Sequence, residues 1–442
     1  MIQVAQILFI LSVLVILHEF GHYITAKMFK VRVEKFYLFM DAGFSLFKKK
    51  IGETEWGIGW LPLGGYVKLS GMIDESLDAE QMSGEPQPWE FRSKPAWQRL
   101  IIMLGGIIVN IILAWFIFTI LYATVGQKYI ATEKIQENGL AFGEVGHKAG
   151  FRNGDKILSV DGKYQPSFNR MTLDVLLGDK VEVERNGEKV DVILTDEMKG
   201  EIISKEGKEF VGPRTTNIKI DSIVPNSNAM KSGLKAGDNI VEINNSKIIF
   251  FDELRDALTK HKNDSVNLSV NRNNQIIKIN ALVSKEGTLG FIQNTKLLKE
   301  DYEVNNQLSF GQAIPAAVNE SWSLLVYNVK QFKLILRPKT EAYKHVQSPI
   351  GIARRLPNTW DWEFIWNFTA LFSIGLAFMN LLPIPGLDGG HALFTIAEMI
   401  TGRKLSDKAM GYVQTGGMII LLSLMALTFG KDIYQLIMDK LL

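Results

Sequence analysis

The pentapeptide His18-Glu19-Phe20-Gly21-His22 holds the side chains with the clearest chemical potential in this 442-residue chain. On a helix, residues i and i+4 share one face, so the two imidazoles can bind one metal ion. Glu19 lies about 100° round the helix from His18, where its carboxylate can reach a metal-bound water without ligating the metal. The H-E-x-x-H spacing therefore predicts zinc-dependent hydrolysis with Glu19 as general base.

The motif lies inside an apolar run that extends from Met1 to Ala26 and is long enough to cross a bilayer. Ionisable side chains are costly in hydrocarbon, so their presence there indicates a function. A structural explanation would need two buried histidines and a buried glutamate satisfied without metal. We expect no cleavable signal peptide, because the run lacks a basic start and a small-residue cleavage site.

Three further stretches lack charged residues and exceed the roughly 20 residues that span a bilayer core. They run over residues 100–125, 364–387 and 409–430. The sequence thus predicts four transmembrane helices, at 1–29, 96–126, 361–391 and 408–431. The net charge of +2 gives no case for nucleic-acid binding. Without cysteine, the available zinc ligands are histidines and carboxylates.

Basic residues gather at one end of each predicted span, within residues 27–35, 92–99 and 403–408. The positive-inside rule places all three groups in the cytoplasm. Both termini and the long stretch from about 127 to 360 are then expected on the extracytoplasmic side.

This long stretch contains an internal repeat, in which residues 150–162 match residues 233–245 at an offset of 83. Turn glycines followed by alternating Ile and Val predict two small β-rich domains, at 127–200 and 212–286. The G-D-x-I pattern resembles PDZ domains, which bind peptides along a sheet edge. Neither copy has a clear Gly-Leu-Gly-Phe carboxylate loop at its expected place, so peptide capture and a spacer or gate role both stay open.

Residues 287–360 are predicted to form a connector with an amphipathic helix over Ala313–Leu336, packed on its neighbours or lying at the membrane surface. Residues 30–95 are predicted to form a cytoplasmic-side β-region, because aromatic, β-branched and glycine residues dominate its first half. An exposed edge strand there could extend a substrate. Trp56, Trp60 and Tyr66 also suit a purely interfacial anchor.

The segment Asn380–His391 is the second chemical cluster. Pro383 and Pro385 remove backbone donors and are expected to break the helix. A catalytic zinc site needs three protein ligands, and Asp388 is the best-placed carboxylate to join the two histidines. Asp388 could instead cap the next helix. His391 is a weaker competitor as a ligand.

The motifs H-E-F-G-H and N-x-x-P-x-P-x-L-D-G, with the duplicated domains and four spans, resemble the site-2 protease family of intramembrane zinc metalloproteases. The resemblance implies a multi-pass α-helical membrane protein with a membrane-associated β-region and two inserted PDZ-like domains, in a bacterial inner membrane. It implies cleavage within or near the transmembrane segment of a single-span substrate, such as an anti-sigma factor or a remnant signal peptide. The PDZ pair would act as a size filter.

The resemblance maps His18, His22 and Asp388 onto the zinc ligands and Glu19 onto the catalytic base. Asn380 would hydrogen-bond the substrate backbone.

A third family element, G-x-x-x-N, matches Gly106–Asn110, but Leu104–Ile107 stands where the family usually has Ala-Gly-Pro. A bend at this place is therefore in question. For Asn110, a substrate contact and a structural contact between helices both stay open.

Two other classes of function stay open from the sequence. A scaffold protein could keep this fold without proteolysis, although it would have no need of Glu19. A metal transporter could use the same ligands, but inverted repeats of broken helices would then be expected. The sequence indicates one broken helix, at Pro383 and Pro385.

Overall fold

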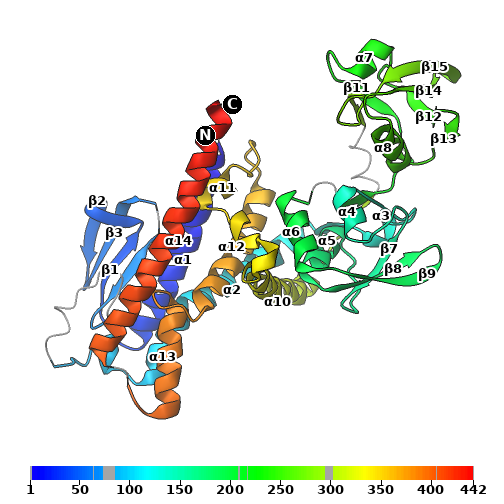
Figure 1. Ribbon diagram of the computed structural model, residues 1–442. Coiled ribbons are helices and arrows are strands. Elements are labelled where there is room, and N and C mark those ends of the chain that lie inside the picture. The colour runs from blue at the N-terminus through cyan, green and yellow to red at the C-terminus, as the bar shows by residue number, and fades with distance from the viewer. Residues whose placement is uncertain are drawn as a thin grey trace. The chain divides into compact units, whose positions relative to one another are not determined.

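The computed structural model describes residues 2–62, 64–72, 85–207, 210–216, 218–293, 302–404 and 406–441 (Figure 1). The chain forms two compact units. The first contains Met1–Gly126, Gln307–Lys330 and Val346–Leu442, and the second contains Gln127–Asn306 with Gln331–His345.

Within the described part of the chain, four helices are long and apolar enough to cross a membrane. They are α1 (Ile2–Met28), α2 (Ala96–Thr124), α12 (Trp362–Leu381) and α14 (Asp407–Leu441). The prediction of four spans is confirmed. The third is shorter than expected, because α12 ends before Pro383 and the chain resumes as a separate helix, α13 (Asp388–Thr401).

The backbones of α1 and α2 touch at glycines. A Cβ on Gly21 would lie 2.3 Å from the Gly105 carbonyl oxygen, and one on Gly105 would lie 2.6 Å from the Gly21 oxygen. Small residues allow such close packing of membrane helices. Although the expected Ala-Gly-Pro is missing, α2 is one continuous helix across this contact.

The amphipathic helix of the connector is α10 (Phe310–Ile335), and its Ala313 and Ala317 pack in one buried cluster with Ala114 and Phe118 of α2. Shorter helical segments complete the first unit. They are the 3₁₀ helix η2 (Phe91–Ser93) and the α-helix α11 (Pro349–Ala353).

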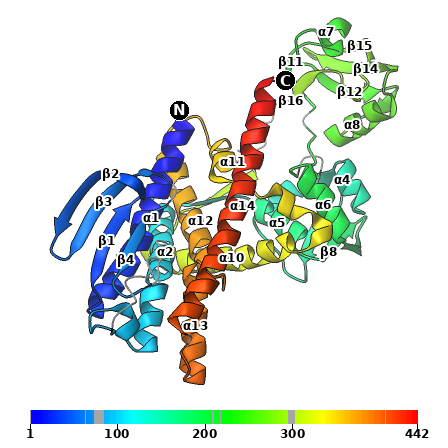
Figure 2. The same cartoon turned by 60° about the vertical axis from the view of Figure 1, so that its left-hand side comes forward.

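The β-region forms a four-stranded sheet in the order β2-β3-β1-β4, lying beside α1 (Figure 2). Its strands are β1 (Val33–Leu38), β2 (Met40–Ile51), β3 (Thr54–Leu61) and β4 (Tyr66–Leu69). Trp56 packs on Phe36 of the sheet and on Tyr23 of α1, at ring distances of 4.6 and 5.1 Å. β4 is an edge strand that pairs with β1.

The two repeats have the same order of elements: strand, short helix, strand, helix, hairpin and closing strand. The first comprises β6 (Leu140–Phe142), α4 (Glu144–Lys148), β7 (Lys156–Val160), α5 (Phe168–Leu177), β8 (Lys180–Arg185), β9 (Glu188–Ile193) and β10 (Val211–Pro213). The second comprises β11 (Ile220–Ile223), α7 (Asn228–Ser232), β12 (Asn239–Ile243), α8 (Phe251–Lys260), β14 (Ser265–Arg272), β15 (Gln275–Leu282) and β16 (Phe291–Gln293). A short β13 (Ser246–Lys247) follows β12.

The closing strand of each domain pairs with its opening strand, β10 with β6 and β16 with β11. Both domains therefore extend beyond the expected limits at 200 and 286. Local patterns do not reveal these pairings, because they join segments about 70 residues apart in the chain.

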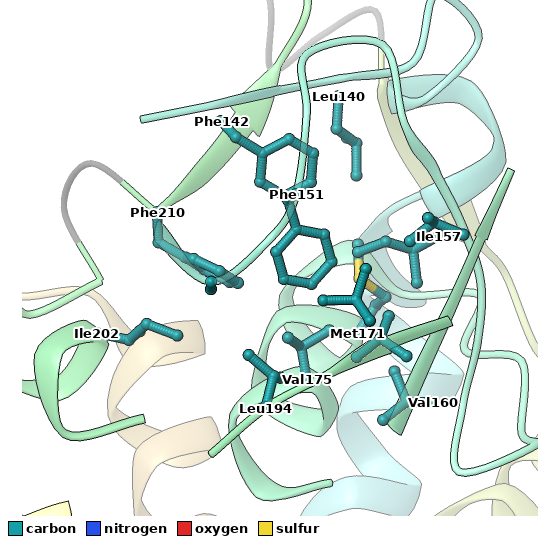
Figure 3. Close-up of a cluster of buried hydrophobic side chains, with 14 of the residues drawn as sticks. Leu140, Phe142, Phe151, Ile157, Val160, Met171, Val175, Leu194, Ile202 and Phe210 are labelled. Carbon is teal, nitrogen blue, oxygen red and sulfur yellow. The ribbon is translucent and has the colours of Figure 1, made fainter. Parts of the chain in front are cut away.

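Each domain has its own core. In the first, Phe142 and Phe151 stack at a ring distance of 4.7 Å and Phe210 packs edge-on against both (Figure 3). The second core is built from aliphatic side chains around Ile240, Leu254 and Val270.

The insertion that carries the two domains is closed at its base by a two-stranded ribbon. β5 (Gln127–Ile130) pairs antiparallel with β17 (Glu303–Asn306), so that Gln127 faces Asn306. The remaining elements of this unit are short. They are α3 (Thr132–Ile135), α6 (Asp196–Ser204), η3 (Pro338–Thr340) and η4 (Ala342–His345).

The same buried ion pair recurs in both domains. Arg272 binds both carboxylate oxygens of Asp238, at 2.7 and 2.8 Å, and the Gly233 carbonyl at 2.8 Å. Arg185 binds Asp155 and the corresponding carbonyl oxygen of the first domain in the same manner. Burial alone would raise the pKa of Asp238, but the bonds from Arg272 outweigh it and hold the pKa below its usual value.

We expect Asp238→Ala to lower the free energy of unfolding of the second domain by about 3 kcal/mol, because Arg272 would lose its carboxylate partner. Since the pKa of Asp238 is depressed, the wild-type pair should contribute fully above about pH 4 and lose its contribution as the pH falls further. Hydrogen exchange of the domain's amides in the full-length protein measures both effects. Asp221→Ala, which removes an exposed carboxylate from β11, is the control. If Asp221→Ala lost as much amide protection as Asp238→Ala, the stabilising role of the Asp238–Arg272 pair would be contradicted.

Candidate metal centre

The three predicted ligands meet at one point within the first unit. The Nε2 atoms of His18 and His22 each lie 3.2 Å from Oδ2 of Asp388, and 3.4 Å from each other. In a tetrahedral zinc site with bonds of about 2.0–2.1 Å, ligand atoms lie about 3.3 Å apart. The three atoms thus fit three corners of such a site, with a fourth left for water.

Asp388 reaches the histidines because the chain turns sharply after α12. The prolines end that helix, and α13 begins at Asp388 with Leu387 in the capping position. A Cβ on Gly389 would lie 2.3 Å from the Leu382 carbonyl oxygen, so this turn needs glycine. The carboxylate of Asp388 faces the imidazoles. If Asp388 were a helix cap, as the alternative interpretation holds, its carboxylate would instead accept hydrogen bonds from the first backbone N–H groups of α13.

The third wall of the site is α2. A Cβ on Gly106 would lie 2.6 Å from Nε2 of His22 and 2.6 Å from Cε1 of His18, so a side chain here would occupy the space of the ligands. Nδ1 of His22 lies 2.8 Å from the Ile102 carbonyl oxygen, to which it can donate. A hydrogen bond at Nδ1 leaves Nε2 free for a metal ion.

Glu19 is next to the three-residue cluster but is not one of its members. Its carboxylate accepts a hydrogen bond from the backbone of Val67 in β4. A Cβ on Gly65 would lie 3.5 Å from Cγ of Glu19, which shows how closely the β-region approaches the motif.

The remaining predicted residues divide into two groups. The amide nitrogens of Asn380 and Asn110 lie 3.2 and 3.1 Å from Nε2 and Nδ1 of His18, respectively. His391 is hydrogen-bonded with Gln414 of α14 and is absent from the metal-ligating cluster found among the described residues.

Sequence reasoning missed Gly106 and Ile102 as parts of the site. The G-x-x-x-N match contained one signal, since it marked Gly106 as the residue one turn before Asn110. Ile102 acts through its main-chain carbonyl, a group that every residue has, so the pattern of side chains in the sequence could not identify it.

Comparisons with known proteins find matches over nearly the whole chain. The model of "Peptidase family M50" matches residues 6–424. The chain is 28% identical to the regulator of sigma-E protease RseP of Escherichia coli, over 98% of this chain and 99% of that protein. It is 28% identical to a putative zinc metalloprotease of Vibrio cholerae, over 96% and 97%, and 27% identical to one of Neisseria meningitidis, over 97% and 98%.

We expect Gly106→Ala to weaken zinc binding at least about 10-fold, because the added methyl group displaces the imidazoles of His18 and His22. Chelator competition on purified protein measures the affinity. Gly375→Ala in α12 is the matched control, since a Cβ there meets no atom within 4 Å. Unchanged zinc affinity in Gly106→Ala would show that α2 does not confine the ligands.

Proposed function

Since the chain belongs to peptidase family M50 as an RseP-like intramembrane zinc metalloprotease, we propose that His18, His22 and Asp388 hold the zinc ion and that Glu19 is the general base. The near-equal separations of the three ligand atoms, 3.2, 3.2 and 3.4 Å, are the observation that carries this assignment. Membership in a protease family favours hydrolysis over the scaffold and transporter alternatives.

When bound, zinc acidifies a water molecule and polarises the scissile carbonyl. Glu19 takes a proton from the attacking water, whose oxygen bonds to the carbonyl carbon of the substrate. The carbon–nitrogen bond then breaks, and Glu19 passes its proton to the leaving amine. The products are a carboxylic acid and an amine, which exchange the second proton of the water to become a carboxylate and an ammonium group, and Glu19 returns to its starting state.

The substrate must be unwound before this chemistry, because a helical peptide bond is hydrogen-bonded and shielded. We propose that it pairs with the edge strand β4, which contacts Glu19 through Val67. Asn380 would then bind the extended main chain, since it is partly exposed at the end of α12. The interfacial-anchor role suits the opposite end of the strand order, where exposed Phe44 of β2 stacks on exposed Trp60 of β3.

For the substrate, we propose a single-span membrane protein such as an anti-sigma factor or a remnant signal peptide. The name of the Escherichia coli relative connects that protein with sigma-E. The distribution of basic residues supports an inner-membrane protein with both termini and the PDZ-like pair on the extracytoplasmic side. There the pair would restrict access by size.

We further propose that the second PDZ-like domain captures a peptide carboxylate. The segment Thr288–Phe291 reads Thr-Leu-Gly-Phe and leads into β16, which begins at Phe291, at the end of the domain instead of its beginning. Gly290 has φ of +88° and its carbonyl accepts hydrogen bonds from Ser227 and from the Val224 N–H. Phe291 contacts Phe251 of α8, so the loop, β16 and α8 lie together as a peptide groove requires.

Glu19→Gln should abolish cleavage of a tagged single-span substrate by purified protein in detergent, with a loss of about 10²–10⁴-fold, while zinc content stays at the wild-type level. The substitution removes the base and keeps all three ligands. Equal cleavage by both proteins would indicate a contaminating protease and remove the role of Glu19. Absence of cleavage by both, with zinc retained, would favour the scaffold alternative.

Peptides that end in an apolar residue with a free carboxylate should bind the full-length protein in calorimetric titrations, and their amidated forms should not. The free carboxylate is the group that a backbone nest at Thr288–Phe291 would recognise. If both forms bind equally or neither binds, the capture role fails and the spacer or gate role is favoured.

A further inference from the structure

Asn110 lies in α2 with no exposed surface, and its amide nitrogen is 3.1 Å from Nδ1 of His18. The other ring nitrogen of His18, Nε2, faces Asp388 at 3.2 Å. We propose that Asn110 is a positioning residue that fixes the tautomer and ring plane of His18, and that it does not contact substrate. This inference rests on the proposed zinc site.

The positions of the hydrogens determine which end of the amide faces His18. A neutral imidazole carries one N–H, and if Nε2 gives its lone pair to the metal, that hydrogen is on Nδ1. Nδ1 then needs an acceptor. Asn110 has one in Oδ1, a buried atom without a hydrogen-bond partner in the described structure. A half-turn of the amide, which exchanges its oxygen and nitrogen, places Oδ1 against the Nδ1–H.

The second histidine is held in the same way. Nδ1 of His22 donates to the Ile102 carbonyl oxygen at 2.8 Å. Ile102, Gly106 and Asn110 are spaced by four residues and therefore share one face of α2. One helix face thus supplies an acceptor to each imidazole and, between them, the space in which the rings lie.

The position of Asn110 argues against a substrate contact. Its side chain is wholly enclosed, whereas Asn380, on the Nε2 side of His18, is partly exposed. Its main chain is also held, because the Ser373 hydroxyl of α12 donates to the Asn110 carbonyl at 2.7 Å. Asn110 is thus held through its side-chain amide and through its main-chain carbonyl. Such a residue is suited to hold a ligand and has no free surface for a peptide.

The test compares Asn110→Leu, which removes the acceptor, with Asn110→Asp, which keeps one. Zinc affinity is measured by chelator competition without substrate, and the visible spectrum of the cobalt-loaded protein reports ligand geometry. We expect Asn110→Leu to bind zinc about 10- to 100-fold more weakly with an altered cobalt spectrum. Asn110→Asp should restore an affinity close to that of the wild type.

Thr369→Ala is the matched control, because it deletes a buried hydrogen bond in α12, from the Thr369 hydroxyl to the Ile365 carbonyl, that involves neither Asn110 nor His18. Its zinc affinity should be unchanged. Equal losses in Thr369→Ala and Asn110→Leu would reduce Asn110 to general packing and overturn the proposal. So would wild-type zinc affinity in Asn110→Leu with a raised KM, which would identify a substrate contact. Failure of the wild type to bind zinc would instead overturn the proposed function itself.

Discussion

The close contact of α1 with α2 at Gly21, Gly105 and Gly106 is the constraint on which the metal centre depends. The two backbones are too close for side chains to fit between them. Because the residues of α2 at this contact are glycines, the imidazoles of His18 and His22 occupy the space that side chains of α2 would otherwise fill. The same proximity brings the Ile102 carbonyl within reach of a ring nitrogen. The packing of α1 on α2 therefore also fixes the orientation of the two histidine ligands.

Polar chemistry at this depth is sustained by partners inside the protein, because hydrocarbon supplies none. The break between α12 and α13 delivers Asp388 to the histidines, and Arg99 of α2 binds Glu398 of α13 at 2.5 Å. This ion pair holds α13, which begins at Asp388, against α2, which contains Gly106. The β-region completes the enclosure on the side of Glu19.

Much of this could be read from the sequence where the signal is local. The spacing of His18 and His22, the four apolar spans and the prolines before Asp388 each act within a few turns of chain. What could not be read depends on segments that are distant in sequence. The role of Gly106 requires knowing which helix packs on the histidine face, and the closing strand β16 requires knowing that it returns to β11. The Thr-Leu-Gly-Phe segment that we propose as a carboxylate loop lies at the end of the second domain and not at its start, which only the pairing of β16 with β11 reveals.

The ribbon of β5 and β17 has a consequence for the architecture as a whole. Because Gln127 and Asn306 are paired, the stretch between them starts and ends at nearly one point, however much lies between. Lengthening a closed stretch of this kind adds little entropic cost to the remainder. The first domain is fixed to the later segment Gln331–His345 by the ion pairs of Arg337 with Asp179 and Asp196. The second domain is therefore the exchangeable part, which evolution or an engineer can duplicate, shorten or replace while the hydrolytic machinery keeps its own geometry.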